Sequence, residues 1–340
     1  MNSQRDREYH MFSHDQQQLI KEIGPRVLIE ILRKMLLIRN FEVRAESAYL
    51  QGKVGGFFHS YMGQEAIQTA AVQAIGQNNW WIASYRCHAL ALLLGATTDE
   101  LMAELYGRAA GNALGRGGSM HFYTDRMLGG FGIVAGQIPA ATGAAFALKY
   151  QGIADQVAVC FFGDGAVAQG AFHESLNLAS LMDLPCIYVI ENNHWGMGTP
   201  VEKAICVKRL AEDHAPGYGM KAYTLDGMDF FNCYSGFTHI KNEVLATGRP
   251  VLVEAVTDRF RGHSISDPGL YRTKVDLKKT MGRDPLILMK QALIEAEIID
   301  EDRYKEMDKE MRDAVVKSME YADKSPWPSP ATLEEDVFAP

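Results

Sequence analysis

The fold of this chain is decided by the stretch VAVCFFGDG at residues 157–165 together with CIYVIENN at residues 186–193. Each stretch starts as a run of apolar β-formers and ends in polar residues. Between them, Gln169 to Met182 carries apolar residues at near-helical spacing, and Pro185 stops that helix before the second run. The sequence therefore predicts a β-loop-α-loop-β unit, whose crossover connection makes the two strands parallel neighbours in one sheet.

Polar side chains follow both predicted strands. Asp164 follows the first strand and Asn193 the second, so both emerge at the carboxyl edge of the sheet, where open α/β sheets bind ligands. A carboxylate and an amide oxygen suit Mg²⁺, which usually shares its coordination shell with phosphates. We expect Gly163 and Gly165 to let the backbone turn sharply and approach an anion, with free N–H groups from the following helix.

Composition sets the bounds for this interpretation. A chain of 340 residues with 47% hydrophobic content can bury a full core, and without a visible linker we expect one large α/β domain. The five cysteines form no C-x-x-C motif, and Cys160 and Cys186 lie in strand runs, which indicates a reduced, cytoplasmic compartment. No apolar run is long enough to span a membrane, and the polar N-terminus does not favour secretion or organellar import. A net charge of −8 argues against general nucleic-acid binding.

Other segments extend the α/β pattern. Pro25 to about Gly52 reads as a long amphipathic helix, and further strands are expected at residues 221–225 and 251–256. The second of these runs into a loop, residues 257–264, that would carry two arginines and His263 to the same carboxyl edge if this strand is parallel to the others. From about Asp284 the chain reads as helical. We therefore divide the sequence into an N-terminal extension, residues 1–24, and a single α/β domain with a helical C-terminal region, residues 25–340.

Gly-Asp-Gly followed by Asn-Asn, in this order and on consecutive strands, resembles the thiamine diphosphate-binding motif. Several other segments match one family in the same order. They are FFHS (57–60), GQEA (63–66), SYRCH (84–88), GRGGSMH (115–121), GIV (132–134), ENNHWGMGT (191–199) and RGHSISDPGLYR (261–272). From about residue 25 to 325 the chain resembles alpha subunits of the thiamine diphosphate-dependent 2-oxoacid dehydrogenases, of the pyruvate type. The resemblance implies a mostly parallel sheet flanked by helices on both faces.

The resemblance also implies the metal and diphosphate ligands. Asp164, Asn193 and the main-chain carbonyl of Trp195 would hold Mg²⁺, although the family more often has Tyr where Trp195 stands. Tyr85 and Arg86 would bind the diphosphate, as suits a hydroxyl and a planar cation. The backbone around Gly163, Gly165 and Ala166 would meet the phosphates.

The remaining roles concern the cofactor rings and protons. Gly132 and Val134 would face the aminopyrimidine, with Val134 helping to bend the cofactor. His263 would lie near the diphosphate and His59 near the reacting carbon, where a neutral imidazole can exchange protons. His88 and His121 are interpreted as packing or supporting residues, and Glu65 receives no role in proton transfer.

A partner chain is part of the same expectation. In this family a glutamate on a pyrimidine-binding domain activates the cofactor, and a 340-residue chain with one diphosphate-binding sheet has no room for that domain. A beta subunit would supply it, in an assembly of two alpha and two beta chains docked on a lipoyl-bearing acyltransferase. The implied reaction is oxidative decarboxylation of pyruvate with acetyl transfer to the lipoyl group.

Alternatives remain open. Branched-chain 2-oxoacid and acetoin dehydrogenases share the diphosphate motif, and the chain departs from the pyruvate type at Phe131, at Arg116 and by one missing residue between Gly269 and Tyr271. This shortened loop puts phosphorylation at Ser264 in doubt. A dinucleotide-binding oxidoreductase is weakly suggested by the glycines at residues 111–118, but a helical segment precedes them, against that fingerprint's context. A non-catalytic scaffold chain of the same fold is the last alternative.

Overall fold

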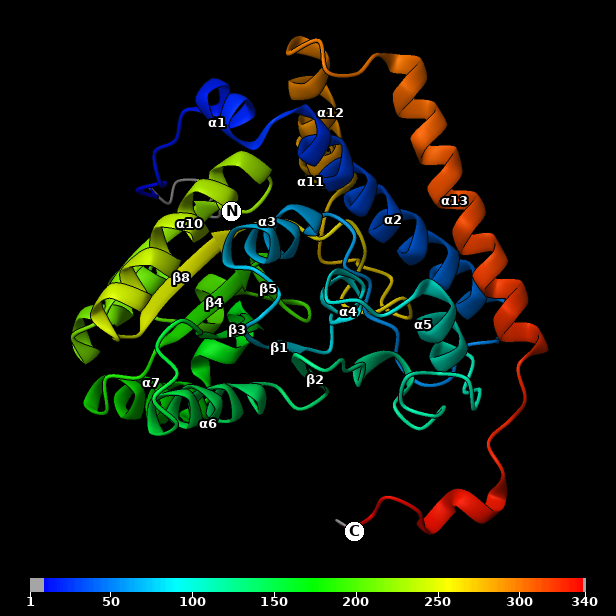
Figure 1. The fold of residues 1–340 in the computed structure, drawn as a ribbon, viewed down its shortest axis with the longest axis horizontal. Helices are drawn as coiled ribbons and strands as arrows, with labels where there is room; N and C mark the ends of the chain where they lie inside the picture. The colour runs from blue at the N-terminus through cyan, green and yellow to red at the C-terminus, as the bar shows by residue number, and fades with distance from the viewer. Residues whose placement is uncertain (1–8, 339–340) are drawn as a thin grey trace.

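The computed structural model describes residues 9–338, which form a layered α/β fold (Figure 1). Its centre is a six-stranded sheet in the order β2-β1-β3-β4-β8-β7, with every neighbouring pair parallel. The strands are β1 (Trp80–Ser84), β2 (Met127–Phe131), β3 (Ala158–Gly163), β4 (Cys186–Asn192), β7 (Lys221–Asp226) and β8 (Val251–Val256). The predicted fold class is confirmed, and β3 and β4 are neighbours as the opening motif requires.

Helices cover both faces of the sheet, so a central strand such as β3 is apolar on both sides. Val159 and Phe161 of β3 pack with α2 (Pro25–Leu50), α3 (Glu65–Ile75) and α10 (Phe230–Thr247). Cys160 and Phe162, which alternate with them, pack on the other face with α6 (Gln137–Tyr150) and α7 (Gly170–Leu181). Figure 1 shows α6 and α7 below the sheet and α3 and α10 above it.

The predicted helix boundaries hold where a local signal marks them. Pro25 occupies the first turn of α2, and Pro285 does the same in α12 with Asp284 as its N-cap. The other elements are α1 (Gln16–Ile23), α4 (His88–Leu93), α5 (Thr98–Leu105), α8 (Val201–Ala204), α9 (Leu210–His214), α11 (Lys274–Met281), α12 (Pro285–Glu295), α13 (Glu301–Lys324), the hairpin β5 (Trp195–Gly196) and β6 (Thr199–Pro200), and the 3₁₀ turns η1 (Gly118–Met120), η2 (Asp164–Ala168), η3 (Ala215–Tyr218) and η4 (Pro330–Glu334).

Part of the predicted N-terminal extension joins the sheet. Residues 1–8 lie outside the described residues, but Met11 forms a parallel bridge with Thr224 of the edge strand β7, and the Phe12 amide donates to the Thr224 carbonyl at 2.8 Å. The division at residue 24 remains a prediction. None of the helices between residues 9 and 338 combines the length and apolar character that a bilayer crossing requires.

The strand ends that face the site are in register. Gly163 at the end of β3 aligns with Glu191 of β4, and Asn192 aligns with Val256 at the end of β8. Because all three strands are parallel, the loops that follow them leave the sheet at one edge. The loops that follow β3, β4 and β8 therefore lie next to one another and surround one site.

Candidate active site

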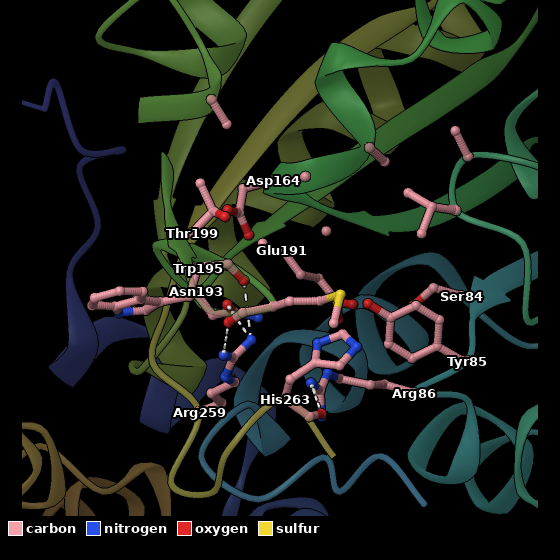
Figure 2. Close-up of a pocket in the computed structure, with 18 of the residues that line it drawn as sticks. Ser84, Tyr85, Arg86, Asp164, Glu191, Asn193, Trp195, Thr199, Arg259 and His263 are labelled. Atoms are coloured by element: carbon pink, nitrogen blue, oxygen red, sulfur yellow. Dashed lines mark hydrogen bonds between the residues drawn. The ribbon is translucent and has the colours of Figure 1, made fainter. Parts of the chain in front are cut away.

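A cavity of about 340 Å³ lies at this carboxyl edge (Figure 2). Asp164, which opens η2 directly after β3, and Asn193, which follows β4, both line the cavity. Both side chains are buried, with exposed fractions of 2% and 6%. The two oxygen ligands predicted from the sequence thus share one enclosed site.

Most of the other predicted site residues line the same cavity. They are Tyr85, Arg86, Val134, Gly163, Gly165, Ala166, Trp195 and His263. His59 and Gly132 are not part of the lining. The His59 ring lies against Tyr85, with ring centroids 4.3 Å apart, whereas an atom added to Gly132 would lie 3.4 Å from Nε2 of His121.

The glycines of the motif behave differently from each other. Gly163 has extended backbone, with φ −80° and ψ 166°, so the expected sharp glycine turn at this residue is wrong. Gly165 does serve a close approach, because a Cβ there would lie 3.4 Å from the Cα of Gly196 in the next loop. The turn η2 also separates β3 from α7, so the free N–H groups nearest the motif belong to a 3₁₀ turn rather than to an α-helix.

The main chain around Trp195 is held in an unusual conformation. His194 and Met197, on either side of the short hairpin strand, both have left-handed φ values, 69° and 54°. The indole of Trp195 packs against the tilted ring of Tyr271, with centroids 4.8 Å apart, and Figure 2 shows it directed away from Tyr85 and Arg86. With the indole directed away, the expected contribution of Trp195 to the site is its main chain, which does not depend on the side chain.

Arg259 holds this loop from inside the protein. Its guanidinium is 1% exposed and donates from Nη1 to the Trp195 carbonyl at 3.0 Å and from Nη2 to the Met197 carbonyl at 2.5 Å. A second bond from Nη2 reaches the Tyr271 hydroxyl at 2.6 Å. The neighbouring Arg261 instead pairs with Glu46, with Nε 2.9 Å from Oε2. Of the two arginines predicted at this edge, one enters the site.

On the other side of the cavity, the rings of His59, Tyr85 and His263 form a cluster next to Arg86. The rings of His59 and His263 meet edge to face at 4.9 Å, and Tyr85 lies 5.5 Å from His263. Arg86 is 4% exposed and donates to the carbonyls of Ser60 at 2.5 Å and His263 at 2.6 Å. One guanidinium thereby fixes the two segments that carry the histidines, and three of its five N–H groups are not used in these bonds.

Burial and nearby cations keep both histidines neutral. Burial, reinforced by the charge of Arg86, lowers the pKa of His59 to about 2 and that of His263 to about 4. Glu191 shifts in the opposite sense: burial raises its pKa to about 7, although hydrogen bonds from Tyr61 at 2.5 Å and Gln68 at 3.2 Å favour the ionised form. The site therefore contains neutral proton carriers beside permanent cations.

Several buried polar residues of the lining had not been predicted. Glu191 belongs to the segment ENNHWGMGT and Gln64 to GQEA. Both segments were matched to the family, but no local pattern predicted a role in the site for either residue. Gln137 opens α6 and donates to the Phe161 carbonyl at 3.1 Å. Arg259 is a further case, since only its loop had been singled out. These residues reach the cavity because the fold brings together segments that are far apart in the sequence.

His88, which was interpreted as a packing or supporting residue, and Glu65, which received no role, are both held in buried ion pairs. His88 is fully buried between Glu42, 2.9 Å from Nδ1, and the Ser119 carbonyl, 2.9 Å from Nε2. Glu65 pairs with Arg39 at 2.5 Å and lies outside the cavity lining. His121 is exposed and contacts the Gly117 carbonyl at 2.9 Å.

The donor set fits a metal-bound diphosphate. Two buried guanidinium groups supply positive charge, and Nε2 of Gln64 is a buried donor with no partner among the residues described. Between residues 9 and 338 no group of three or more His, Cys, Asp and Glu side chains is arranged as a metal site. The ligands expected here are of another kind, namely one carboxylate, one amide and one carbonyl, which suit Mg²⁺ rather than Zn²⁺.

The fold and the site define the class: an α/β protein with a diphosphate-type pocket at the carboxyl edge of a parallel sheet. The chain belongs to the dehydrogenase E1 component family, whose model matches residues 33–331, and this membership implies thiamine diphosphate as cofactor. It is 38% identical over 312 residues to the pyruvate dehydrogenase E1 component subunit alpha of Rickettsia typhi, covering 91% of this chain and 95% of that protein. The subunit of the same name from Rhizobium meliloti is 38% identical over 322 residues, covering 94% and 92%. The chloroplastic subunit alpha-3 of Arabidopsis thaliana is also 38% identical, over 92% of this chain and 74% of its own length.

Proposed function

We propose that this chain is the alpha subunit of a pyruvate dehydrogenase. With a beta subunit it would decarboxylate pyruvate oxidatively and pass the acetyl group to a lipoyl group on an acyltransferase component. The observation that carries the proposal is the convergence of Asp164, Asn193 and the Trp195 carbonyl on one buried cavity that also contains two guanidinium groups. The relatives, which match more than nine-tenths of the chain, are named pyruvate dehydrogenase subunits, and this supports the choice of pyruvate.

Asp164, Asn193 and the Trp195 carbonyl would hold Mg²⁺ on the diphosphate. Arg86 would balance the phosphate charge with its remaining N–H groups, while Arg259 keeps the Trp195 carbonyl in place through the 3.0 Å bond. The backbone at Gly163, Gly165 and Ala166 would meet the phosphates, and that at Gly132 and Val134 the pyrimidine.

Thiamine diphosphate, when bound, supplies the nucleophilic carbon and the electron sink for decarboxylation. The chain's own contribution is to position protons. His59 and His263 are neutral at physiological pH because burial lowers the pKa of each, so each ring would present one N–H donor and one acceptor nitrogen to the reacting groups. Their edge-to-face contact, with centroids 4.9 Å apart, would keep them beside the substrate rather than free in a loop.

A beta subunit would complete the site. Support comes from apolar side chains around the cavity that the chain leaves in solvent: Ile133 is 78% exposed, Val134 46% and Met197 65%. Such a surface at a polar site favours coverage by another protein. The partner would supply the carboxylate that activates the pyrimidine.

Replacing Asp164 tests the metal assignment. The full chain is purified with its beta subunit, and thiamine diphosphate binding is followed by calorimetry in Mg²⁺ alongside pyruvate decarboxylation. Asp164→Ala should abolish both, whereas Asp155→Ala, at an exposed residue before β3, should change neither. Unchanged affinity and decarboxylation in Asp164→Ala would contradict the proposal.

The substrate is tested in the same complex by comparing pyruvate with 2-oxoisovalerate and acetoin. The highest kcat/KM should belong to pyruvate. A preference for the branched acid or for acetoin would instead assign the chain to one of those dehydrogenases, with the cofactor site unchanged. Binding of NAD without thiamine diphosphate would point to the dinucleotide alternative, and no ligand binding by the assembled complex to a scaffold role.

A further inference from the structure

Gln64 has an incomplete set of hydrogen bonds at the centre of the site. The side chain is 1% exposed and lines the cavity beside Asn193. Its Oε1 accepts a bond from Nδ2 of Asn193 at 3.1 Å, but its Nε2 is buried and has no partner among the described residues. A buried amide donor without an acceptor is unfavourable, so this atom points to a missing group.

The backbone of Gln64 is fixed from both sides. Gly63 has φ +99°, and a Cβ there would lie 2.4 Å from the Asp258 carbonyl oxygen, so this position requires glycine. The Gly63 amide donates to Glu65 at 2.9 Å, and Glu65 is clamped by Arg39 at 2.5 Å. The buried ion pair therefore explains the GQEA segment structurally, since it holds Gln64 at the start of α3 facing Asn193.

The orientation of the two amides follows from donor and acceptor chemistry. Arg259 can only donate, and its Nη1 lies 3.5 Å from Oδ1 of Asn193. The oxygen of Asn193 must therefore face Arg259, which turns Nδ2 toward Gln64. Gln64 must then present its oxygen to that nitrogen. The Nε2 atom of Gln64 consequently points away from Asn193.

We propose that Gln64 is a positioning residue for the metal ligand Asn193 and a donor to the diphosphate. By accepting from Nδ2, it keeps the Asn193 amide from flipping, so that oxygen rather than nitrogen is offered to Mg²⁺. Its Nε2 donates to a diphosphate oxygen, which completes the hydrogen bonds of a buried amide. This inference rests on the proposed function, because it assigns Gln64 to the same cofactor.

The test uses Gln64→Met in the full chain purified with its beta subunit. Mn²⁺ replaces Mg²⁺, and its affinity in the presence of thiamine diphosphate is measured by electron paramagnetic resonance. We expect the affinity to fall by about 10-fold or more, as for other residues that orient metal ligands. The matched control is Gln68→Met, one turn further along α3, where the buried side chain bonds Glu191 and touches no proposed metal ligand. Its Mn²⁺ affinity should stay close to that of the unchanged protein.

A double variant separates positioning from a general structural effect. In Asn193→Asp both side-chain oxygens can bind the metal, so the orientation no longer matters. Adding Gln64→Met to Asn193→Asp should then have little effect on Mn²⁺ affinity, whereas an equal loss in both backgrounds would overturn the positioning role. Thermal unfolding of each variant without cofactor confirms that the folded chain is being compared.

Gln64→Glu tests the donor separately, and it also serves if the Met variant does not fold. The carboxylate still accepts from Asn193 but cannot donate, so thiamine diphosphate affinity should fall by about 10-fold while Mn²⁺ binding persists. Unchanged diphosphate affinity would overturn the donor role. If the unchanged complex bound no Mn²⁺ with thiamine diphosphate, the proposed function itself would fail. If the unchanged complex and the Gln64 variants bound Mn²⁺ and thiamine diphosphate with equal affinity, only this inference would fail.

Discussion

The imidazole of His59 meets that of His263 edge to face, with ring centroids 4.9 Å apart, although His59 precedes α3 and His263 follows β8. Arg86 enforces this contact by bonding the carbonyls of Ser60 and His263. The same guanidinium contributes to keeping both rings neutral. The arrangement therefore has a consequence for stability as well as for proton transfer.

The stability of the chain without cofactor should depend on His59 in acid. Folded His59 has its pKa lowered to about 2 from 6.5, chiefly by burial. Below pH 6.5 His59 is protonated in the unfolded chain but stays neutral in the folded chain. The contribution of neutral His59 to the free energy of unfolding is therefore present above pH 6.5 and is lost as the pH falls. Between pH 6 and pH 4, His59→Gln should lose less stability than the unchanged chain, by about 1.4 kcal/mol per pH unit at most.

Urea unfolding at several pH values measures this difference. Glu191 titrates in the opposite sense, since its pKa is raised to about 7, but its contribution is common to both proteins and cancels. His121→Gln, at an exposed histidine, is the control and should follow the unchanged chain. Identical pH profiles for His59→Gln and the unchanged chain would show that the His59 ring is not kept neutral by burial.

The sequence predicted those parts of the site that depend on strand order. Asp164 and Asn193 each follow an apolar run, and consecutive parallel strands bring such residues to one edge whatever the remaining packing. The same reasoning placed the loop of residues 257–264 there on the condition that its strand is parallel, and β8 is parallel to β4. Helix starts at Pro25 and Pro285 were predictable because proline fits the first turn.

Side-chain direction in loops was not predictable from the sequence. Arg259 and Arg261 are two residues apart, yet one is buried against Trp195 and the other pairs with Glu46 at the surface. Only the tertiary fold decides between them. The pairing of Gln64 with Asn193 is of the same kind, because it joins segments 129 residues apart that share no local pattern.

The pair of Arg39 and Glu65 should be important for stability. Arg39 also binds Asp284 through both Nη atoms, at 2.8 and 2.9 Å, so its loss would leave two carboxylates without their cation. Arg39→Met should lower the free energy of unfolding by about 3–5 kcal/mol. The control Arg33→Met removes an exposed pair with Glu310 and should cost less than about 1 kcal/mol. Equal urea midpoints for the two variants would contradict a structural role for the buried pair.

Glu104 should determine the order of the glycine-rich loop. Its carboxylate is fully buried and accepts four main-chain N–H groups, from residues Ala113, Gly115, Gly117 and Gly118, at 2.7 to 3.1 Å. Glu104→Gln replaces one acceptor oxygen by a donor and should cost about 2–3 kcal/mol. Hydrogen exchange at residues 113–118 should speed up accordingly.

Glu100→Gln is the matched control for Glu104. Glu100 accepts from the Thr97 amide at 2.8 Å in the capping box of the same helix, α5, and its loss should cost about 0.5–1 kcal/mol. Its effect on exchange should be confined to the start of α5. If Glu104→Gln left the loop as protected as in the unchanged chain, the carboxylate would not be what orders it.

Arg86→Lys should weaken cofactor binding although it preserves the charge. The guanidinium spans the Ser60 and His263 carbonyls at 2.5 and 2.6 Å, and a single ammonium group cannot reproduce that planar fork. Losing one charged hydrogen bond costs about 1.5–3 kcal/mol, so thiamine diphosphate should bind about 10- to 100-fold more weakly by calorimetry in the assembled complex. The control is Arg126→Lys. Arg126 lies over Trp80 at the amino end of β2, away from the carboxyl edge, so this variant should bind thiamine diphosphate with unchanged affinity. Full affinity in Arg86→Lys would mean that charge alone suffices and that the two backbone bonds do not prepare the site.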